Sequence, residues 1–207
     1  MKLLILGATG KTGSELVKQA LERGFEVTAL VRFPHKIKTK DNRLTVVTGS
    51  PLDKENLRKV VPGNDAVLSA LGHPDLKESY LVTEAAQTLI TVMNTSNVKR
   101  FMILSSTLVS AGGSFMTKIP RYLTRHALND SAQMEKIVGS SSLAWTIVRL
   151  VRLTNKSVAP YRIFENEPPA VSPSISRKSV AACMLDLVAD QAYVDCILVE
   201  ANFRRDR

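Results

Sequence analysis

A glycine-rich stretch follows the first run of apolar residues in the chain. Gly7, Gly10 and Gly13 are spaced Gly-x-x-Gly-x-x-Gly, directly after the apolar residues 3–6 and before a segment with apolar residues at helical spacing. This order predicts a buried strand, a tight turn and a helix. Glycines let the backbone approach a phosphate closely, and the first N–H groups of a helix attract negative charge. The stretch therefore predicts a site for the pyrophosphate of a dinucleotide.

The lysine and threonine after Gly10 also resemble the end of a nucleoside-triphosphate loop. That motif requires another glycine five positions before Gly10, and this position is Ile5. The spacing therefore excludes a triphosphatase site. The remaining alternative is a structural glycine turn that binds nothing, which the strand–turn–helix context makes the weaker interpretation.

The residue at the end of the second predicted strand distinguishes between two dinucleotides. An NAD site usually has an aspartate or glutamate here, which binds the ribose 2′-hydroxyl. This chain has Arg32, and no carboxylate lies between Val27 and Lys40. An arginine can pair with a 2′-phosphate through two parallel hydrogen bonds. The sequence thus favours NADP(H) over NAD(H), the alternative being that Arg32 is only a solvated strand end.

Strand and helix patterns alternate along the chain and predict the elements that position these residues. The alternation predicts one α/β domain over residues 1–207, a doubly wound, Rossmann-like parallel sheet with helices on both faces. The irregular segments 108–125 and 155–175 are expected to form a small substrate-side region. Strands are expected at residues 2–7, 26–32, 44–48, 66–71, 100–105, 145–150 and 196–200, and helices at 11–23, 53–61, 78–95, 118–139 and 177–189.

Composition and charge exclude several other classes of protein. The chain contains 44% hydrophobic and 23% charged residues, as is ordinary for a globular protein. It has no apolar run as long as a membrane span and no signal-peptide pattern. A cytoplasmic protein is therefore expected. Its net charge is +9, but no recognition-helix or RNA-binding signature accompanies the basic residues, which argues against nucleic acid. Cys183 and Cys196 are expected to be reduced thiols, and no residue cluster has metal-ligand spacing.

Six segments, in order along the chain, resemble the atypical short-chain dehydrogenase/reductase group. Relatives in this group include NmrA-like proteins and the biliverdin reductase B/flavin reductase type. The resemblance covers nearly the whole chain and implies an NADP-binding Rossmann fold. The segments are residues 7–13, 27–32, 65–72, 104–106, 143–149 and 175–181.

The resemblance implies roles for matching positions in the nucleotide half of the site. Arg32 is expected to bind the 2′-phosphate, and Leu71 and Gly72 are expected to flank the adenosine side. The chain departs from its relatives at Ser50-Pro51, where they usually have an aspartate and a small apolar residue beside the adenine. The pyrophosphate is expected to contact Gly7, Thr9, Gly10, Lys11, Thr12 and Gly13.

The same resemblance places other residues near the nicotinamide. Ser105 and Ser106 are expected beside it, and residues 149–152 are expected along its far edge. Arg149 and Arg152 would suit an acidic or phosphorylated acceptor. Leu150, also expected at the cofactor, stands where relatives usually have proline.

Candidate catalytic residues are few. The wider superfamily uses a Tyr-x-x-x-Lys pair, whose lysine lowers the tyrosine pKa so that the tyrosine can exchange a proton. The nearest match is Tyr122, with His126 in place of lysine. Ser106 is the other candidate, for a hydrogen bond to substrate, although a serine after a strand also forms turns. His73 is expected to be an exposed loop residue.

Two functions follow from these residues. The first is an NADPH-dependent reductase of a small flavin-like, quinone-like or carbonyl acceptor, because hydride transfer needs only the cofactor and an aligned acceptor. The alternative is a non-catalytic redox sensor of the NmrA type, which binds NAD(P) and passes its occupancy to a partner protein. The weakened Tyr-x-x-x-Lys pattern favours this alternative. A membrane partner is not expected for either function.

Overall fold

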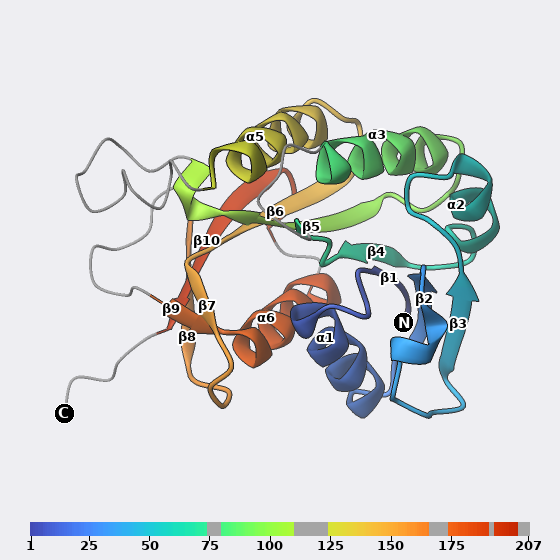
Figure 1. The fold of residues 1–207 in the computed structure, drawn as a ribbon, viewed down its shortest axis with the longest axis horizontal. Helices are drawn as coiled ribbons and strands as arrows, with labels where there is room; N and C mark the ends of the chain where they lie inside the picture. The colour runs from blue at the N-terminus through green and yellow to red at the C-terminus, as the bar shows by residue number, and fades with distance from the viewer. Residues whose placement is uncertain (74–79, 110–123, 166–173, 191–192, 203–207) are drawn as a thin grey trace.

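The computed structural model describes residues 1–73, 80–109, 124–165, 174–190 and 193–202 (Figure 1). These residues form an eight-stranded sheet in the order β3-β2-β1-β4-β5-β6-β10-β8. Every neighbouring pair is parallel except β10 and β8, which are antiparallel. The strands are β1 (Lys2–Leu6), β2 (Glu26–Val31), β3 (Leu44–Thr48), β4 (Ala66–Ser69), β5 (Arg100–Ser106), β6 (Ala144–Leu150), β8 (Tyr161–Glu165) and β10 (Cys196–Asn202).

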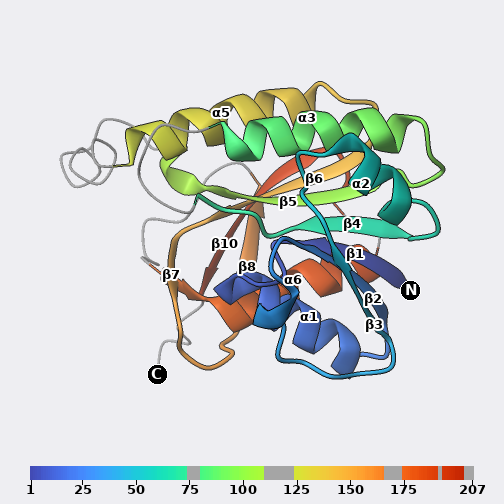
Figure 2. The same cartoon turned by 45° about the vertical axis from the view of Figure 1, so that its right-hand side comes forward.

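Helices cover both faces of this sheet, as Figures 1 and 2 show. One face carries α1 (Lys11–Glu22) and α6 (Arg177–Ala189), and the other carries α2 (Lys54–Val60), α3 (Leu81–Asn94) and α5 (Arg125–Gly139). The predicted doubly wound Rossmann fold is therefore confirmed. No helix among the described residues is both long and apolar enough to cross a membrane.

Two hydrophobic cores, one on each side of the sheet, hold the layers together. Alternate residues of β1 point to opposite faces, so that Leu3 and Ile5 join the core under α1 and α6. Leu4 and Leu6 join the core under α2, α3 and α5. A strand buried on both faces must be apolar throughout, which explains the continuous apolar run at the start of the chain.

Helix ends follow local signals that the sequence contains. Asp53 caps α2, and its carboxylate accepts hydrogen bonds from the backbone N–H groups of Glu55 and Asn56. Gly24 follows the C-cap residue Arg23 of α1 and has φ +82°, a conformation that favours glycine. Both features agree with the predicted boundaries.

The structure differs from the prediction at one edge of the sheet. Residues 155–175 contain the antiparallel edge strand β8 and the start of the short strand β9 (Ser174–Ser176), so the expectation of an irregular segment is wrong for these residues. Strand β9 pairs with β7 (Arg152–Thr154) in a separate two-stranded sheet. Helix α5 begins at Arg125, and residues 118–123 of the predicted helical stretch lie outside the described part of the chain. Two 3₁₀ turns, η1 (Pro34–Lys36) and η2 (Thr107–Val109), follow β2 and β5.

Candidate functional site

The glycine loop between β1 and α1 packs so tightly that two of its glycines have no room for a side chain. Gly7 has φ +78°, and a Cβ atom there would be 2.6 Å from the carbonyl oxygen of Ala70. A Cβ atom on Gly13 would be 2.1 Å from the carbonyl oxygen of Gly7. The N–H of Gly10 donates to this same oxygen at 2.9 Å, which closes the turn. The loop therefore lies directly against the end of β4, at the carboxyl edge of the sheet.

The N-terminus of α1 is suited to an anion. Its N-cap is Gly10, which contributes no side-chain hydrogen bond, and the first turn contains no acidic residue. Thr9 and Lys11 are exposed, whereas Thr12 is almost fully buried. The helix thus presents backbone N–H groups and a lysine without a competing carboxylate, a donor set that fits the pyrophosphate of a dinucleotide.

A basic, aromatic cluster follows β2, where the sequence predicts the 2′-phosphate. The exposed Arg32 has its guanidinium carbon 5.9 Å from the centre of the Phe33 ring, and the Lys36 amine lies 4.8 Å from the same centre. Within the described part of the chain, no carboxylate forms an ion pair with Arg32. Its positive charge is therefore available to an external anion.

Leu71 and Gly72 continue from β4 towards the glycine loop. Leu71 packs against the core under α3. A Cβ atom on Gly72 would have no described atom within 4 Å. No atom of the described residues thus fills the space beside Gly72, which is compatible with a position that flanks a bound nucleotide.

Ser105 and Arg149, expected at the nicotinamide, are both engaged by a carboxylate that the sequence analysis missed. Arg149 donates from Nε and Nη2 to the two oxygens of Glu135, at 2.9 and 2.5 Å. The Ser105 hydroxyl donates to Oε1 of Glu135 at 2.6 Å. The Arg149 and Glu135 side chains are 12% and 7% exposed. The charge of Arg149 is therefore balanced inside the protein, whereas Arg152 is exposed.

The sequence does contain a signal for Glu135. The buried residues of α5 are Asp130, Ser131, Met134, Glu135 and Val138, which recur at helical spacing on one face. Two carboxylates on the buried face of a helix require partners, because a buried charge is costly unless it is paired. Helix α5 lies over β5 and β6 in Figures 1 and 2, so it brings Glu135 to the ends of these strands.

His73, expected to be exposed, lies instead in a largely buried pair with Asp130. Its Nε2 atom is 3.1 Å from Oδ2 of Asp130, and the two side chains are 15% and 0% exposed. The expected exposure was wrong because the sequence after β4 indicates a loop but does not show that α5 packs over this loop and supplies the carboxylate. His73 thus joins the polar residues at the carboxyl edge of the sheet.

The remaining candidates take different positions. The Ser106 hydroxyl accepts a hydrogen bond from the N–H of Leu108 at 3.3 Å, as expected for a serine that forms a turn. Leu150 is 7% exposed, and its side chain packs into the core under α1 and α6. Tyr122 lies outside the described residues. No group of metal-ligating side chains occurs among the described residues.

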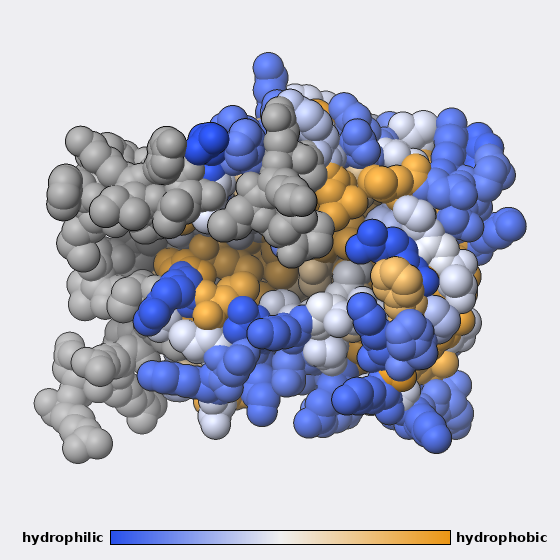
Figure 3. All heavy atoms as spheres, in the orientation of Figure 1, coloured by the Kyte–Doolittle hydropathy of each residue, from blue (hydrophilic) through white to orange (hydrophobic). Residues whose placement is uncertain are grey.

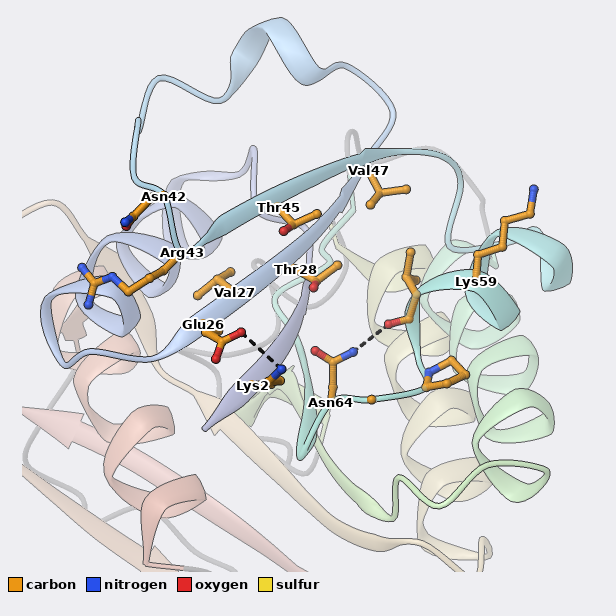
Figure 4. A pocket seen from close by; sticks show the side chains of 13 residues that line it. Lys2, Glu26, Val27, Thr28, Asn42, Arg43, Thr45, Val47, Lys59 and Asn64 are labelled. Carbon is orange, nitrogen blue, oxygen red and sulfur yellow. Dashed lines mark hydrogen bonds and ion pairs between the residues drawn. The ribbon is translucent and has the colours of Figure 1, made fainter.

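A hollow of about 330 Å³ lies at the opposite, amino edge of the sheet (Figure 4). Lys2 and Glu26, at the starts of β1 and β2, line it and pair with each other at 3.4 Å. Arg43 also lines it and pairs with Asp41. The hollow lies at the amino ends of β1 and β2, whereas the glycine loop follows the carboxyl end of β1, so we assign the hollow no part in the site. On the face in Figure 3, hydrophobic side chains gather in a hollow near the centre, with hydrophilic ones below it.

The fold and the glycine loop define a dinucleotide-binding Rossmann protein. Residues 7–191 match the family model described as NAD(P)H-binding, so the chain belongs to this family of atypical short-chain dehydrogenases/reductases. An uncharacterized chloroplastic protein of Arabidopsis thaliana is 31% identical over 98% of this chain and 74% of its own length.

Solved structures extend the likeness of the fold. ChuY, an anaerobilin reductase from Escherichia coli O157:H7, has a TM-score of 0.82 at 18% identity and covers 100% of both chains. A short-chain dehydrogenase/reductase from Veillonella parvula in complex with NADP has a TM-score of 0.78 at 18% identity, over 97% of this chain and 94% of that one. At these identities the likeness shows the fold alone.

Proposed function

We propose that this protein is an NADPH-dependent reductase of a small flavin-like, quinone-like or carbonyl acceptor. The observation that carries the proposal is the junction of β1 and α1, where Gly7 and Gly13 exclude side chains and the helix N-terminus has no side-chain cap. Such a junction receives a pyrophosphate, whose charge the backbone N–H groups and the helix dipole stabilise.

The preference for NADPH rests on Arg32. This exposed residue stands at the end of β2, where an NAD site usually has a carboxylate, and it forms no ion pair in the described part of the chain. The complex of the Veillonella parvula protein with NADP shows that a protein of this fold accepts the phosphorylated dinucleotide. Lys36, over the same Phe33 ring as Arg32, adds positive charge.

An aromatic acceptor is supported by the character of the surface. The hydrophobic hollow in Figure 3 offers apolar contact, and basic side chains such as Arg152 lie at the carboxyl end of β6. Bound NADPH supplies a hydride, and the protein contributes binding, orientation and electrostatics. ChuY, a protein with the same fold, is an anaerobilin reductase.

A second candidate function is a redox sensor that binds NADP(H) without catalysis and signals to a partner protein. Two observations favour it. Ser105 and Arg149 are held by Glu135, and His126 stands where the lysine of a Tyr-x-x-x-Lys pair is expected.

The two functions are separated by measuring NADPH oxidation at 340 nm with a panel of flavins, quinones and dicarbonyls. A reductase oxidises NADPH faster with at least one acceptor, and the Gly13→Ala variant, which disturbs the phosphate loop, loses this activity. The Gly139→Ala variant serves as the control, because a Cβ atom there makes only ordinary contact with Trp145 at 3.7 Å. Tight NADPH binding with no accelerated oxidation by any acceptor would reject the reductase and support the sensor.

A further inference from the structure

The pair of His73 and Asp130 is not used in the dinucleotide site proposed above. It is nevertheless largely buried at the carboxyl edge of the sheet. The Nε2 atom of His73 is 3.1 Å from Oδ2 of Asp130, with the imidazole 15% exposed and the carboxylate fully buried. A carboxylate that contacts one ring nitrogen fixes the ring and decides which nitrogen remains for another contact. Here the remaining nitrogen is Nδ1, for which the described part of the chain supplies no hydrogen-bond partner.

Asp130 is itself held in place by the first turn of α3. Its Oδ2 accepts a hydrogen bond from the N–H of Val82 at 3.1 Å, and its Oδ1 accepts one from the N–H of Thr83 at 2.9 Å. The Thr83 hydroxyl donates to the backbone carbonyl of Asp130 at 2.8 Å. These contacts join α5 to the first turn of α3, so the carboxylate cannot rotate away from the imidazole without leaving buried N–H groups unpaired.

The position of His73 relative to the proposed cofactor follows from the topology. The carbonyl of Ala70 borders the glycine loop, and His73 comes three residues later. With the pyrophosphate at α1 and the adenosine towards Arg32 at the end of β2, the nicotinamide half extends over the ends of β4 and β5. His73 directly follows Gly72, which is expected to flank the adenosine side. Its contact with Asp130 turns its side chain towards α5, the helix whose Glu135 contacts the ends of β5 and β6.

We propose that His73 is the proton donor of the reductase and that Asp130 is its positioning residue. The proposal rests on the proposed function and names its acceptor class, a carbonyl or quinone. NADPH supplies two electrons and one hydrogen as a hydride to the acceptor. The Nδ1–H bond of the protonated His73 breaks, an O–H bond forms on the carbonyl oxygen, and the ring is left neutral with Nε2–H facing Asp130. Solvent then returns the proton.

The first test needs no turnover. The chain has three histidines, so long-range ¹H–¹⁵N spectra resolve each ring, and single substitutions assign them. We expect the neutral His73 ring to carry its hydrogen on Nε2, and the Asp130→Asn variant to lose this preference. NADP⁺ should shift the His73 signals, whereas 2′-phospho-ADP-ribose, which lacks the nicotinamide, should not. A ring with its hydrogen on Nδ1, or equal shifts with both ligands, would overturn the assignment.

The second test compares two acceptors in the His73→Gln variant, whose amide can keep the hydrogen bond to Asp130. With a quinone such as menadione, we expect kcat to fall by about a hundredfold or more, the usual worth of a general acid. With N-methylacridinium, a cation that takes a hydride and needs no proton, the rate should stay within about twofold. NADPH affinity, measured by fluorescence titration, should also be unchanged.

Each other outcome decides against a particular statement. Equal losses with both acceptors, or weaker NADPH binding, would show that His73 is structural. An unchanged rate with menadione would remove His73 as the donor and leave the reductase intact. If no acceptor accelerates NADPH oxidation by the wild-type protein, the reductase is rejected, and the assignment of His73 as its proton donor is rejected with it.

Discussion

Arg149, at the end of β6, donates two hydrogen bonds to Glu135 of α5, at 2.9 and 2.5 Å, in a pair that is almost fully buried. This two-point contact is the strongest geometry available to an arginine and a carboxylate. It joins the helix layer to the sheet at the edge where the site lies. Ser105 donates to the same carboxylate, so Glu135 sets the positions of the ends of both β5 and β6.

Breaking this pair should destabilise the protein strongly. Replacing either Glu135 or Arg149 with alanine leaves its partner as an unpaired buried charge, which costs about 3–5 kcal/mol in the free energy of unfolding. Replacing both at once, with Glu135→Leu and Arg149→Met, removes both charges and should recover most of that loss. Urea unfolding of the single and double variants measures these differences. Additive losses would mean that the two side chains do not interact.

Adding one methyl group at Gly13 should damage the phosphate loop. A Cβ atom there would be 2.1 Å from the carbonyl oxygen of Gly7, so the turn has to move. We expect Gly13→Ala to lower the free energy of unfolding by roughly 1–3 kcal/mol, as overpacking does, and to weaken NADPH binding in a fluorescence titration. Gly139→Ala makes the same change in another helix with space for it, and it should be neutral or slightly stabilising. Unchanged NADPH affinity in Gly13→Ala would contradict the placement of the pyrophosphate.

The sequence predicts the glycine loop and the helices at 11–23 and 53–61 because the signals for each lie within a few consecutive residues. It does not predict the pairs of Glu135 with Arg149 and of His73 with Asp130, which join residues 14 and 57 positions apart. These contacts depend on where α5 lies over the sheet, which composition and periodicity leave open. The antiparallel strand β8 was missed for a similar reason, since a short edge strand carries a weak local signal until its partner β10 is known.

Cys196 should react slowly with thiol reagents at pH 8. Burial, reinforced by the charge of Glu165, raises the pKa of this thiol to about 11. The thiol also donates to the carbonyl of Tyr193 at 2.8 Å. Because the thiolate is the reactive form, Ellman's reagent should label Cys196 in a Cys183→Ala variant about a hundredfold more slowly than free cysteine. Labelling as fast as free cysteine would contradict the raised pKa.

The same shift in pKa makes stability depend on pH. The unfolded thiol ionises near pH 9.0 and the folded thiol near 11, so between these values the unfolded chain binds fewer protons than the folded one. The contribution of the Cys196 thiol to the free energy of unfolding should therefore be constant below about pH 9. It should fall as the pH rises from there towards 11. The Cys196→Ala variant should show a smaller fall over this range in urea unfolding. An equal fall in both proteins would assign the pH dependence to other groups.

Replacing Arg32 should change the choice between the two dinucleotides. If its guanidinium pairs with the 2′-phosphate, Arg32→Ala loses a charge-assisted contact worth roughly 1.5–3 kcal/mol, which weakens NADPH binding about tenfold or more. NADH has no 2′-phosphate, so its affinity should change little. Arg43→Ala removes the same charge before β3, at the opposite edge of the sheet, and should leave the affinity for both dinucleotides unchanged. Calorimetric titration measures all three proteins, and an equal loss of NADPH and NADH affinity in Arg32→Ala would reject the 2′-phosphate contact.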